Sequence, residues 1–311
     1  MTKVKSALLA TAVAFAFVGT AHAEGCDKVT FSDVGWTDIT ATTAAASVLL
    51  EALGYETETK LLSVPVTYTA LAEGDVDVFL GNWMPTMEAD IAPYREAGSV
   101  ETVRTNLEGA KYTLATNEAG AALGIKDFAD IAANKDALEG RIYGIEPGND
   151  GNRLILDIIE KDAFGLKGFE VVESSEQGML AEVARSTGDA KPIIFLGWEP
   201  HPMNANFKMT YLTGGDDFFG PNLGGAVVAT NVRKGYVAEC PNTGKLLENL
   251  AFSLQMENEI MGAILNDGTD PAEAATTWLK ANPATIEPWL AGVTAKDGGD
   301  GLAAVKTALG L

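Results

Sequence analysis

Histidine and cysteine are scarce in this chain: its 311 residues include only His22, His201, Cys26 and Cys240 of these two types. Clusters of such side chains build zinc and other transition-metal sites, so the composition excludes a His/Cys-rich metal centre, and we assign no metal and no cofactor. Basic residues are also few, 22 against 43 acidic ones, for a net charge of −21. This balance argues against binding to nucleic acid or to an anionic membrane surface, because both depend on clustered Lys and Arg.

The chain also lacks the short motifs of common enzymes. It contains no G-x-x-x-x-G-K-[ST], no G-x-G-x-x-G, no G-x-S-x-G and no H-E-x-x-H. His201, in Glu199-Pro200-His201-Pro202, lies beside Trp198, and a surface or structural role is favoured for it. A Ser-His-Asp hydrolase that uses His201 is disfavoured by the missing nucleophile motif, although it stays open. We therefore assign no catalytic residue.

The N-terminus has the pattern of an export signal. Lys3 and Lys5 precede an apolar stretch at residues 7–18, and Ala21-His22-Ala23 supplies an A-x-A cleavage site. The sequence thus predicts a cleaved signal peptide at residues 1–23 and a periplasmic mature chain. The apolar stretch is too short to cross a bilayer, and no later segment has about 18 apolar residues in a row.

Export permits disulfide bonds. Cys26 and Cys240 are the only pair in the chain, and an even count in an exported protein favours a bridge between them. Ala23-Glu24-Gly25-Cys26 also loosely resembles a lipoprotein cleavage box, in which Cys26 would be lipidated and Cys240 left alone. Because Glu24 fits that box poorly, we favour the disulfide.

Strand-like and helix-like segments alternate along the chain, which predicts an α/β fold with mostly parallel strands and helices on both faces. No low-complexity linker and no internal repeat divides the chain, so it can form two lobes that the polypeptide crosses more than once. Strands are expected at 29–32, 57–64, 76–80, 112–116, 141–145, 170–172, 193–197 and 226–230. Helices are expected at 38–53, 65–72, 127–134, 152–161, 176–185, 244–265 and 271–280.

Three of the five tryptophans occupy the same kind of position. Trp36, Trp83 and Trp198 each follow an expected strand, the last two in the similar phrases FLGNW and FLGW. Ligands bind at the carboxyl edge of open α/β sheets, so three such tryptophans indicate a site, whereas one alone would indicate packing. Several ring faces suit a quaternary ammonium ion, with about 0.5–2 kcal/mol of cation–π attraction from each. Sugars and aromatic ligands use the same side chains.

The segments around these tryptophans resemble the periplasmic choline-binding proteins of ABC importers, within the glycine betaine/choline/proline betaine substrate-binding family. The likeness is carried by FSDVGWTDIT (31–40), DVFLGNWMPT (77–86), KYTL (111–114), GIEPGNDGN (144–152) and FLGWEPH (195–201). It implies a bilobal periplasmic-binding-protein fold of type II, with two mostly parallel-core sheets flanked by helices and the ligand in the interlobe cleft. Residues 24–111 and 213–311 would form lobe 1, and residues 112–212 lobe 2.

The resemblance also implies how the ligand is held. Asp38 and Asn149 match the positions that bind the hydroxyl end of choline, and Cys26 and Cys240 match a disulfide of the family. The implied function is capture of choline by a monomeric protein, with acetylcholine or betaines as further ligands, and delivery to an ABC permease in the inner membrane. The trimethylammonium group would be surrounded by an aromatic box of Trp36, Trp83, Tyr112 and Trp198.

Each site assignment that the resemblance implies has an alternative structural explanation. Tyr112 fits a plain strand residue, Asp38 fits a helix N-cap, and Asn149 fits a glycine-rich turn. That turn could also hold an anion such as a betaine carboxylate, assisted by Arg153, although an arginine there is more often solvated. The rival functions are therefore a receptor for glycine betaine or proline betaine and, less favoured, an enzyme that acts on choline esters.

Overall fold

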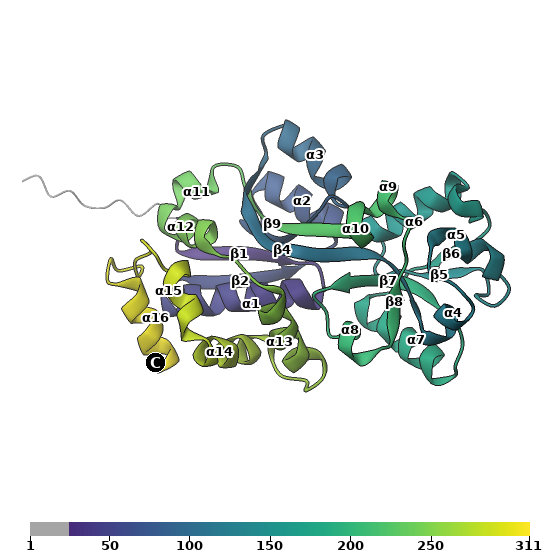
Figure 1. Cartoon of the computed structure of the whole chain (residues 1–311). Coiled ribbons are helices and arrows are strands. Elements are labelled where there is room, and N and C mark those ends of the chain that lie inside the picture. The colour runs from purple at the N-terminus through teal and green to yellow at the C-terminus, as the bar shows by residue number, and fades with distance from the viewer. Residues whose placement is uncertain (1–24) are drawn as a thin grey trace, which may run out of the picture.

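Residues 25–311, which a computed structural model describes, form two lobes that share one mixed sheet (Figure 1). The expected signal peptide at 1–23 lies outside the described residues. The strand order is β2-β1-β3-β9-β4-β7-β5-β6, with β8 beside β4. We call the end of the sheet built on β1 (Lys28–Asp33) the β1 lobe and the end built on β5 (Arg141–Tyr143) the β5 lobe.

Parallel strands form the core of each lobe. In the β1 lobe, β1 pairs with β2 (Glu56–Leu61) and β3 (Val78–Met84). In the β5 lobe, β5 pairs with β6 (Glu170–Val172) and β7 (Ile194–Glu199). β3 is buried along nearly its whole length, as is usual for a strand whose two faces are both covered by helices.

Antiparallel strands join the two parallel cores, so the protein has one continuous sheet where we expected two. β4 (Val100–Asn117) pairs with β9 (Gly225–Arg233) as far as Lys111 and with β7 from Lys111 onward, and it ends beside β8 (Met209–Tyr211). The sequence indicated only residues 112–116 of β4. Three register shifts against β9 interrupt the alternation of inward- and outward-facing residues in the first half of β4. A search for alternating apolar and polar residues therefore does not find that half.

Helices cover the sheet on both sides. In the view of Figure 1, α2 and α3 lie above the strands of the β1 lobe, and α1, α13 and α14 lie below them. The helices of the β1 lobe are α1 (Thr37–Ala52), α2 (Val64–Glu73), α3 (Glu88–Glu96), α11 (Tyr236–Glu239), α12 (Pro241–Asn249), α13 (Leu254–Leu265), α14 (Pro271–Ala281), α15 (Ile286–Trp289) and α16 (Gly301–Leu309). Those of the β5 lobe are α4 (Glu118–Ala122), α5 (Phe128–Ile131), α6 (Asp150–Glu160), α7 (Glu176–Gly188), α8 (Met203–Asn206) and α9 (Asp216–Phe219), with α10 (Pro221–Gly224) at the junction. Single 3-10 turns occupy Ala132–Asn134, Ala163–Gly165 and Pro283–Thr285.

One expected helix is wrong. Residues 244–265 form the end of α12 and the whole of α13, because the backbone is extended at Leu250 and Ser253 begins α13 as its N-cap.

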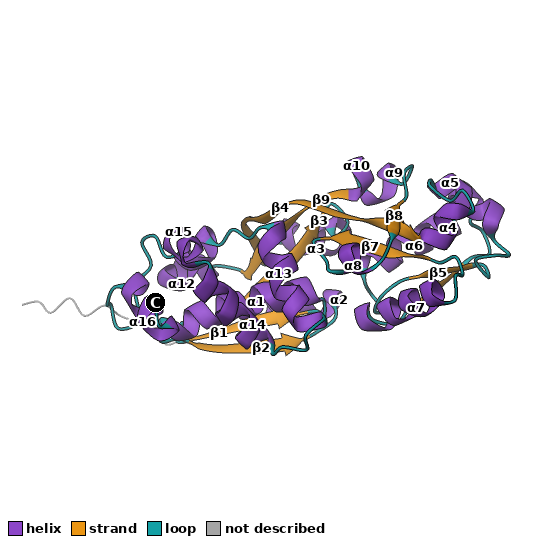
Figure 2. Ribbon diagram, turned by 60° about the horizontal axis from the view of Figure 1, so that its bottom comes forward, coloured by secondary structure: helices purple, strands orange, loops and turns teal. Residues whose placement is uncertain are grey.

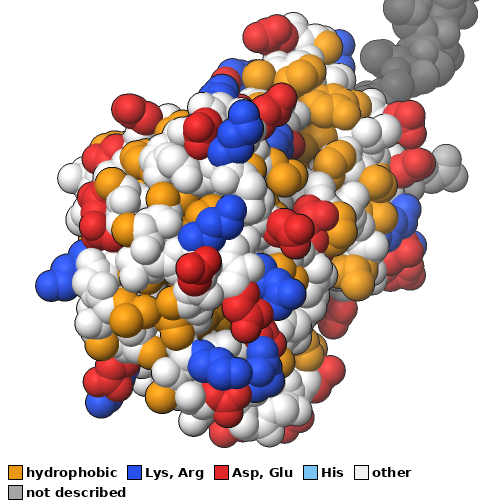
Figure 3. Space-filling view, turned by 90° about the vertical axis from the view of Figure 1, so that its right-hand side faces the viewer, with side chains coloured by type: hydrophobic (Ala, Val, Ile, Leu, Met, Phe, Trp, Pro, Cys, Tyr) orange, Lys and Arg blue, Asp and Glu red, His pale blue; other side chains and the backbone are white. Residues whose placement is uncertain are grey.

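Among residues 25–311, no helix combines the length and the apolar character that crossing a bilayer requires. Figure 2 shows that the elements form an elongated molecule. Figure 3 shows one end of the β5 lobe, where Lys and Arg are interspersed with Asp and Glu. That face offers no continuous basic surface.

The Cys26–Cys240 disulfide is present and leaves no free cysteine in the described chain. It joins the residues before β1 to the start of α12, across a sequence separation of 214 residues, with Cα atoms 5.4 Å apart. That spacing is ordinary for a disulfide. The bridge uses both sulfur atoms, so the lipoprotein alternative, which needs Cys26 for itself, does not fit the structure.

We expect loss of this bridge to destabilise the protein by about 2–4 kcal/mol, because a long loop in the unfolded chain is no longer closed. Urea unfolding followed by tryptophan fluorescence should show this loss in a Cys26→Ser/Cys240→Ser variant. A reductant should destabilise the parent protein and leave the double variant unchanged. Equal stability of parent and variant would contradict the expectation.

Candidate functional site

A cavity of about 260 Å³ lies between the two lobes. The cavity is small, so it suits a ligand of few heavy atoms. Its lining also includes Ile145 and Asp150, which the sequence did not single out. All six residues that were expected to bind the ligand line it: Trp36, Asp38, Trp83, Tyr112, Asn149 and Trp198. The structure thus brings together positions that span most of the described chain, and their role in binding stays a prediction.

The first aromatic wall stands at the start of α1. Gly35, with φ of +84°, lets the chain turn from β1 into the helix, a conformation that costs other residues more. Trp36 follows as the N-cap residue, and its indole N–H donates to Glu146 Oε1 at 2.8 Å. Because Glu146 belongs to the β5 lobe, this hydrogen bond crosses the cleft and sets the orientation of the indole ring.

Three more rings complete the box. Trp83 and Trp198 are the penultimate residues of β3 and β7, one residue inside the strands rather than after them. The Tyr112 ring lies between them, with its centroid 6.0 Å from that of Trp83 and 6.2 Å from that of Trp198. The planes meet at 59° and 82°, so the rings form walls and do not stack on one another. None of the three side chains is more than 5% exposed.

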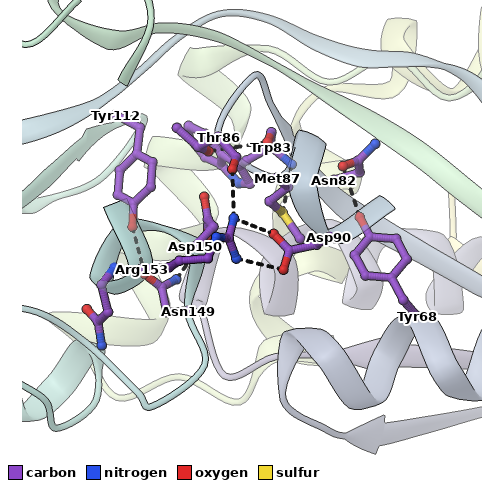
Figure 4. Close-up of polar contacts among 11 residues, drawn as sticks. Tyr68, Asn82, Trp83, Thr86, Met87, Asp90, Tyr112, Asn149, Asp150 and Arg153 are labelled. Carbon is purple, nitrogen blue, oxygen red and sulfur yellow. Dashed lines mark hydrogen bonds and ion pairs between the residues drawn. The ribbon is translucent and has the colours of Figure 1, made fainter. Parts of the chain in front are cut away.

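Tyr112 is held in place by the start of α6 (Figure 4). Its hydroxyl donates to Asn149 Oδ1 at 3.0 Å, and the same oxygen accepts the backbone N–H of Asn152 at 3.1 Å. Asn149 therefore caps α6, as the turn interpretation had it, and also lines the cavity. Gly151 makes the approach possible, since a Cβ there would lie 2.0 Å from the Tyr112 hydroxyl oxygen.

Asp38 places a buried carboxylate at the edge of the box. It is 1% exposed, and its Oδ2 accepts the indole N–H of Trp83 at 3.0 Å, whereas its Oδ1 has no hydrogen-bond partner among the described residues. Burial, reinforced by the negative charge of Glu176, raises the pKa of Asp38 to about 8. A cation in the cavity would stabilise the ionised form, and a hydroxyl group could donate to Oδ1. The site therefore fits a small cation that carries a hydrogen-bond donor.

Glu176, at the start of α7, joins the lobes beneath this box. Its carboxylate accepts from Thr37 N at 2.8 Å and from Thr37 Oγ1 at 2.5 Å, so the first turn of α1 is capped from the opposite lobe. No side chain caps α1 at its N-cap position, and the alternative in which Asp38 is an N-cap is wrong. His201 is buried, with Nε2 3.3 Å from Glu176 Oε1, which agrees with a structural role and not with a surface one.

Arg153 makes a second connection across the cleft (Figure 4). Its guanidinium donates to both carboxylate oxygens of Asp90 at 2.7 and 2.8 Å, and to the Thr86 carbonyl oxygen at 3.1 Å. The Arg153 side chain is 38% exposed, so it is partly solvated as expected, but its guanidinium is paired with Asp90 and does not face the cavity as an anion ligand. These donors are committed to the β1 lobe, so the glycine-rich turn has no help from Arg153 in holding a carboxylate.

Two α/β lobes closed over a small aromatic cavity, with polar bonds across the cleft, define a ligand-binding receptor of the type II periplasmic-binding-protein fold. The family described as the substrate-binding domain of ABC-type glycine betaine transport systems (OpuAC) matches residues 27–281, and the chain belongs to it. Substrate-binding proteins of ABC importers are periplasmic or extracellular, and they are not enzymes.

Solved structures agree with this assignment. An ABC-transporter choline-binding protein in complex with choline is 76% identical, with a TM-score of 0.92 over 92% of this chain and 99% of its own. An unliganded, semi-closed form, also 76% identical, has a TM-score of 0.86 over 93% of this chain and 100% of its own. The TM-score is higher against the choline complex than against the semi-closed form, which agrees with the closed cleft of this protein. The glycine betaine/carnitine transport binding protein GbuC of Listeria monocytogenes is 32% identical over 130 residues, 42% of each chain.

We expect Arg153→Gln to open the ligand-free protein, because it removes the ion pair with Asp90 that holds the lobes together. Small-angle scattering should show a larger radius of gyration for this variant than for the parent. Arg185→Gln is the matched control, since Arg185 pairs with Glu182 on the surface of α7 within one lobe. Identical radii for the two variants would mean that the Arg153 contact does not favour closure.

Proposed function

We propose that this protein is the substrate-binding protein of an ABC importer, and that it captures choline in the aromatic cavity and delivers it to a membrane permease. The single observation that carries the proposal is the buried Asp38 beside the aromatic box, with one carboxylate oxygen unpaired. A trimethylammonium group cannot donate a hydrogen bond, so ring faces are its suitable partners, and a hydroxyl group can donate to Asp38. The 76% identity to a structure solved with choline supports the choice of ligand.

Capture proceeds by closure of the lobes. The β1 lobe contributes Trp36 and Trp83, and the β5 lobe contributes Trp198 and Asn149, so a ligand that contacts both sets stabilises the closed form. The permease then recognises the closed protein. We place the mature protein in the periplasm as a monomer, after cleavage of residues 1–23.

The proposed motion needs two hinges. We place one near residue 111, where β4 changes its pairing from β9 to β7. Our sequence-based prediction put the other near residue 212, with lobe 2 at residues 112–212. Phe219 packs against Phe128 of α5 in the β5 lobe, with the two ring centroids 5.9 Å apart. Residue 219 therefore still belongs to the β5 lobe, which favours a second crossing after it, within residues 220–225.

The rival functions are less well supported. Glycine betaine carries a carboxylate where choline carries a hydroxyl, and an ionised Asp38 would repel it. For an esterase, His201 is the one histidine of the described chain, and both of its ring nitrogens are engaged: Nδ1 accepts the Met203 N–H at 2.9 Å and Nε2 faces Glu176. Neither nitrogen is available to activate a nucleophile.

We expect choline to bind at least about tenfold more tightly than glycine betaine, a difference of about 1.4 kcal/mol. Asp38→Asn should weaken choline and narrow this gap, since it removes both the charge attraction and the repulsion. Trp83→Ala should weaken both ligands together, because the ring contacts the group that they share. Calorimetric titration measures each affinity. Equal affinities in the parent, or a ratio that Asp38→Asn leaves unchanged, would favour a general betaine receptor.

The raised pKa of Asp38 predicts a pH effect. The folded, ligand-free protein holds a proton on Asp38 up to about pH 8, whereas an unfolded chain releases it near pH 3.8, so the stability from this group falls as pH rises between those values. Choline stabilises the ionised form, and the increase in Tm on adding saturating choline should therefore grow from pH 5 to pH 8. In Asp38→Asn that increase should not grow over this pH range. Equal increases in the parent at both pH values would contradict this linkage.

A further inference from the structure

The cavity holds a second carboxylate with an unpaired oxygen. Asp150, the first residue of α6, is fully buried and lines the cavity. Its Oδ1 accepts from Asn149 Nδ2 at 3.1 Å, but its Oδ2 has no hydrogen-bond partner among the described residues. The neighbouring Thr86 hydroxyl donates to the Trp83 carbonyl oxygen at 3.3 Å, and its proximity to Asp150 lowers the pKa of that carboxyl group relative to the value that burial alone would give.

Unpaired buried oxygens are rare in folded proteins, and each one calls for an explanation. Among the described residues, two cavity-lining side chains carry such an atom, Asp38 Oδ1 and Asp150 Oδ2. They approach the cavity from opposite lobes, Asp38 from α1 and Asp150 from α6. A ligand in the cavity is thus placed between two carboxyl groups that lack a full set of protein partners.

We infer that Asp150 is a second ligand-binding residue and that Asp38 and Asp150 hold one proton between them in the complex, so that one carboxyl group accepts the hydrogen of the ligand's hydroxyl and the other donates to its oxygen. This inference rests on the proposed function. A hydroxyl group has one donor and two acceptor lone pairs, so one carboxylate and one carboxylic acid can satisfy both of its capacities. Two ionised carboxylates would leave an excess negative charge beside a ligand of charge +1 in a buried site, which is costly.

The surroundings of Asp150 are compatible with a proton on its carboxyl group. The charged groups that face it are Asp90 and Arg153, which pair with each other (Figure 4), and the phenols of Tyr112 and Tyr68 face it as neutral groups. Burial is the main cause that raises the pKa of Asp150 to about 7; the negative charge of Asp90 adds to the rise, and the Thr86 hydroxyl and Arg153 oppose it.

Three ligands distinguish the hydrogen bond that the ligand's oxygen accepts from the one that its hydroxyl group donates. Choline can donate and accept, its methyl ether, (2-methoxyethyl)trimethylammonium, can only accept, and tetramethylammonium can do neither. Asp150→Asn keeps a donor, whereas Asp150→Leu has a similar volume and no polar atom. We expect Asp150→Leu to weaken choline and the ether at least about fivefold and to leave tetramethylammonium unchanged. Asp150→Asn should keep choline within about threefold of the parent.

Asp157→Leu, at a half-buried position on the same helix that pairs with Lys161 outside the cavity, is the matched control and should change none of the three affinities. If Asp150→Asn and Asp150→Leu lower the affinity for all three ligands equally, the inference is overturned, because lost charge or packing would then explain the effect of both substitutions. Should Asp150→Leu fail to fold, the parent protein decides: its preference for the ether over tetramethylammonium should decline from pH 6 to pH 9, and a constant preference overturns the inference. A parent protein that does not bind choline would refute the proposed function instead.

Discussion

The burial of a carboxylate among indole rings is the constraint on which the rest of this structure depends. Taking Asp38 out of water costs several kcal/mol unless a partner compensates, and among the described residues the side-chain donor to its carboxylate is the Trp83 N–H. Without a cation beside it, the ionised form of Asp38 is therefore electrostatically unfavourable in the closed protein. A cation of the right size removes that cost, which couples the stability of the closed form to the chemistry of the ligand.

Three consecutive residues at the start of α1 connect binding with closure. Trp36 donates to Glu146, Thr37 donates to Glu176, and Asp38 accepts from Trp83. The first two hydrogen bonds cross the cleft, and the third positions a cavity-lining carboxylate. Because the three residues share one helical turn, a ligand that shifts Asp38 also acts on the bonds that hold the lobes together. The long strand β4 joins the two lobes in one sheet.

Regular patterns in the sequence predicted the fold well. The positions of β1, α1, α2 and α14 were expected within a few residues, because alternation, an apolar helical face or a terminating glycine marks each one locally. Sequence reasoning missed the first half of β4 and the break at Leu250–Ser253. Bulges against β9 and the packing of α12 and α13 decide those features, and both are properties of the assembled protein.

By itself, the sequence determined the class of protein and predicted the three tryptophans that line the cavity, because tryptophans at strand ends and the motifs around them are local signals. The one pair of cysteines, in a chain with an expected export signal, likewise predicted the bridge. Only the tertiary structure decided the roles of Glu176 and Arg153. Glu176 contacts a residue 139 positions away and Arg153 one 63 positions away, and no local pattern encodes such a pair. The same holds for the unpaired oxygen of Asp150, since an orphaned atom is defined by what surrounds it in the fold.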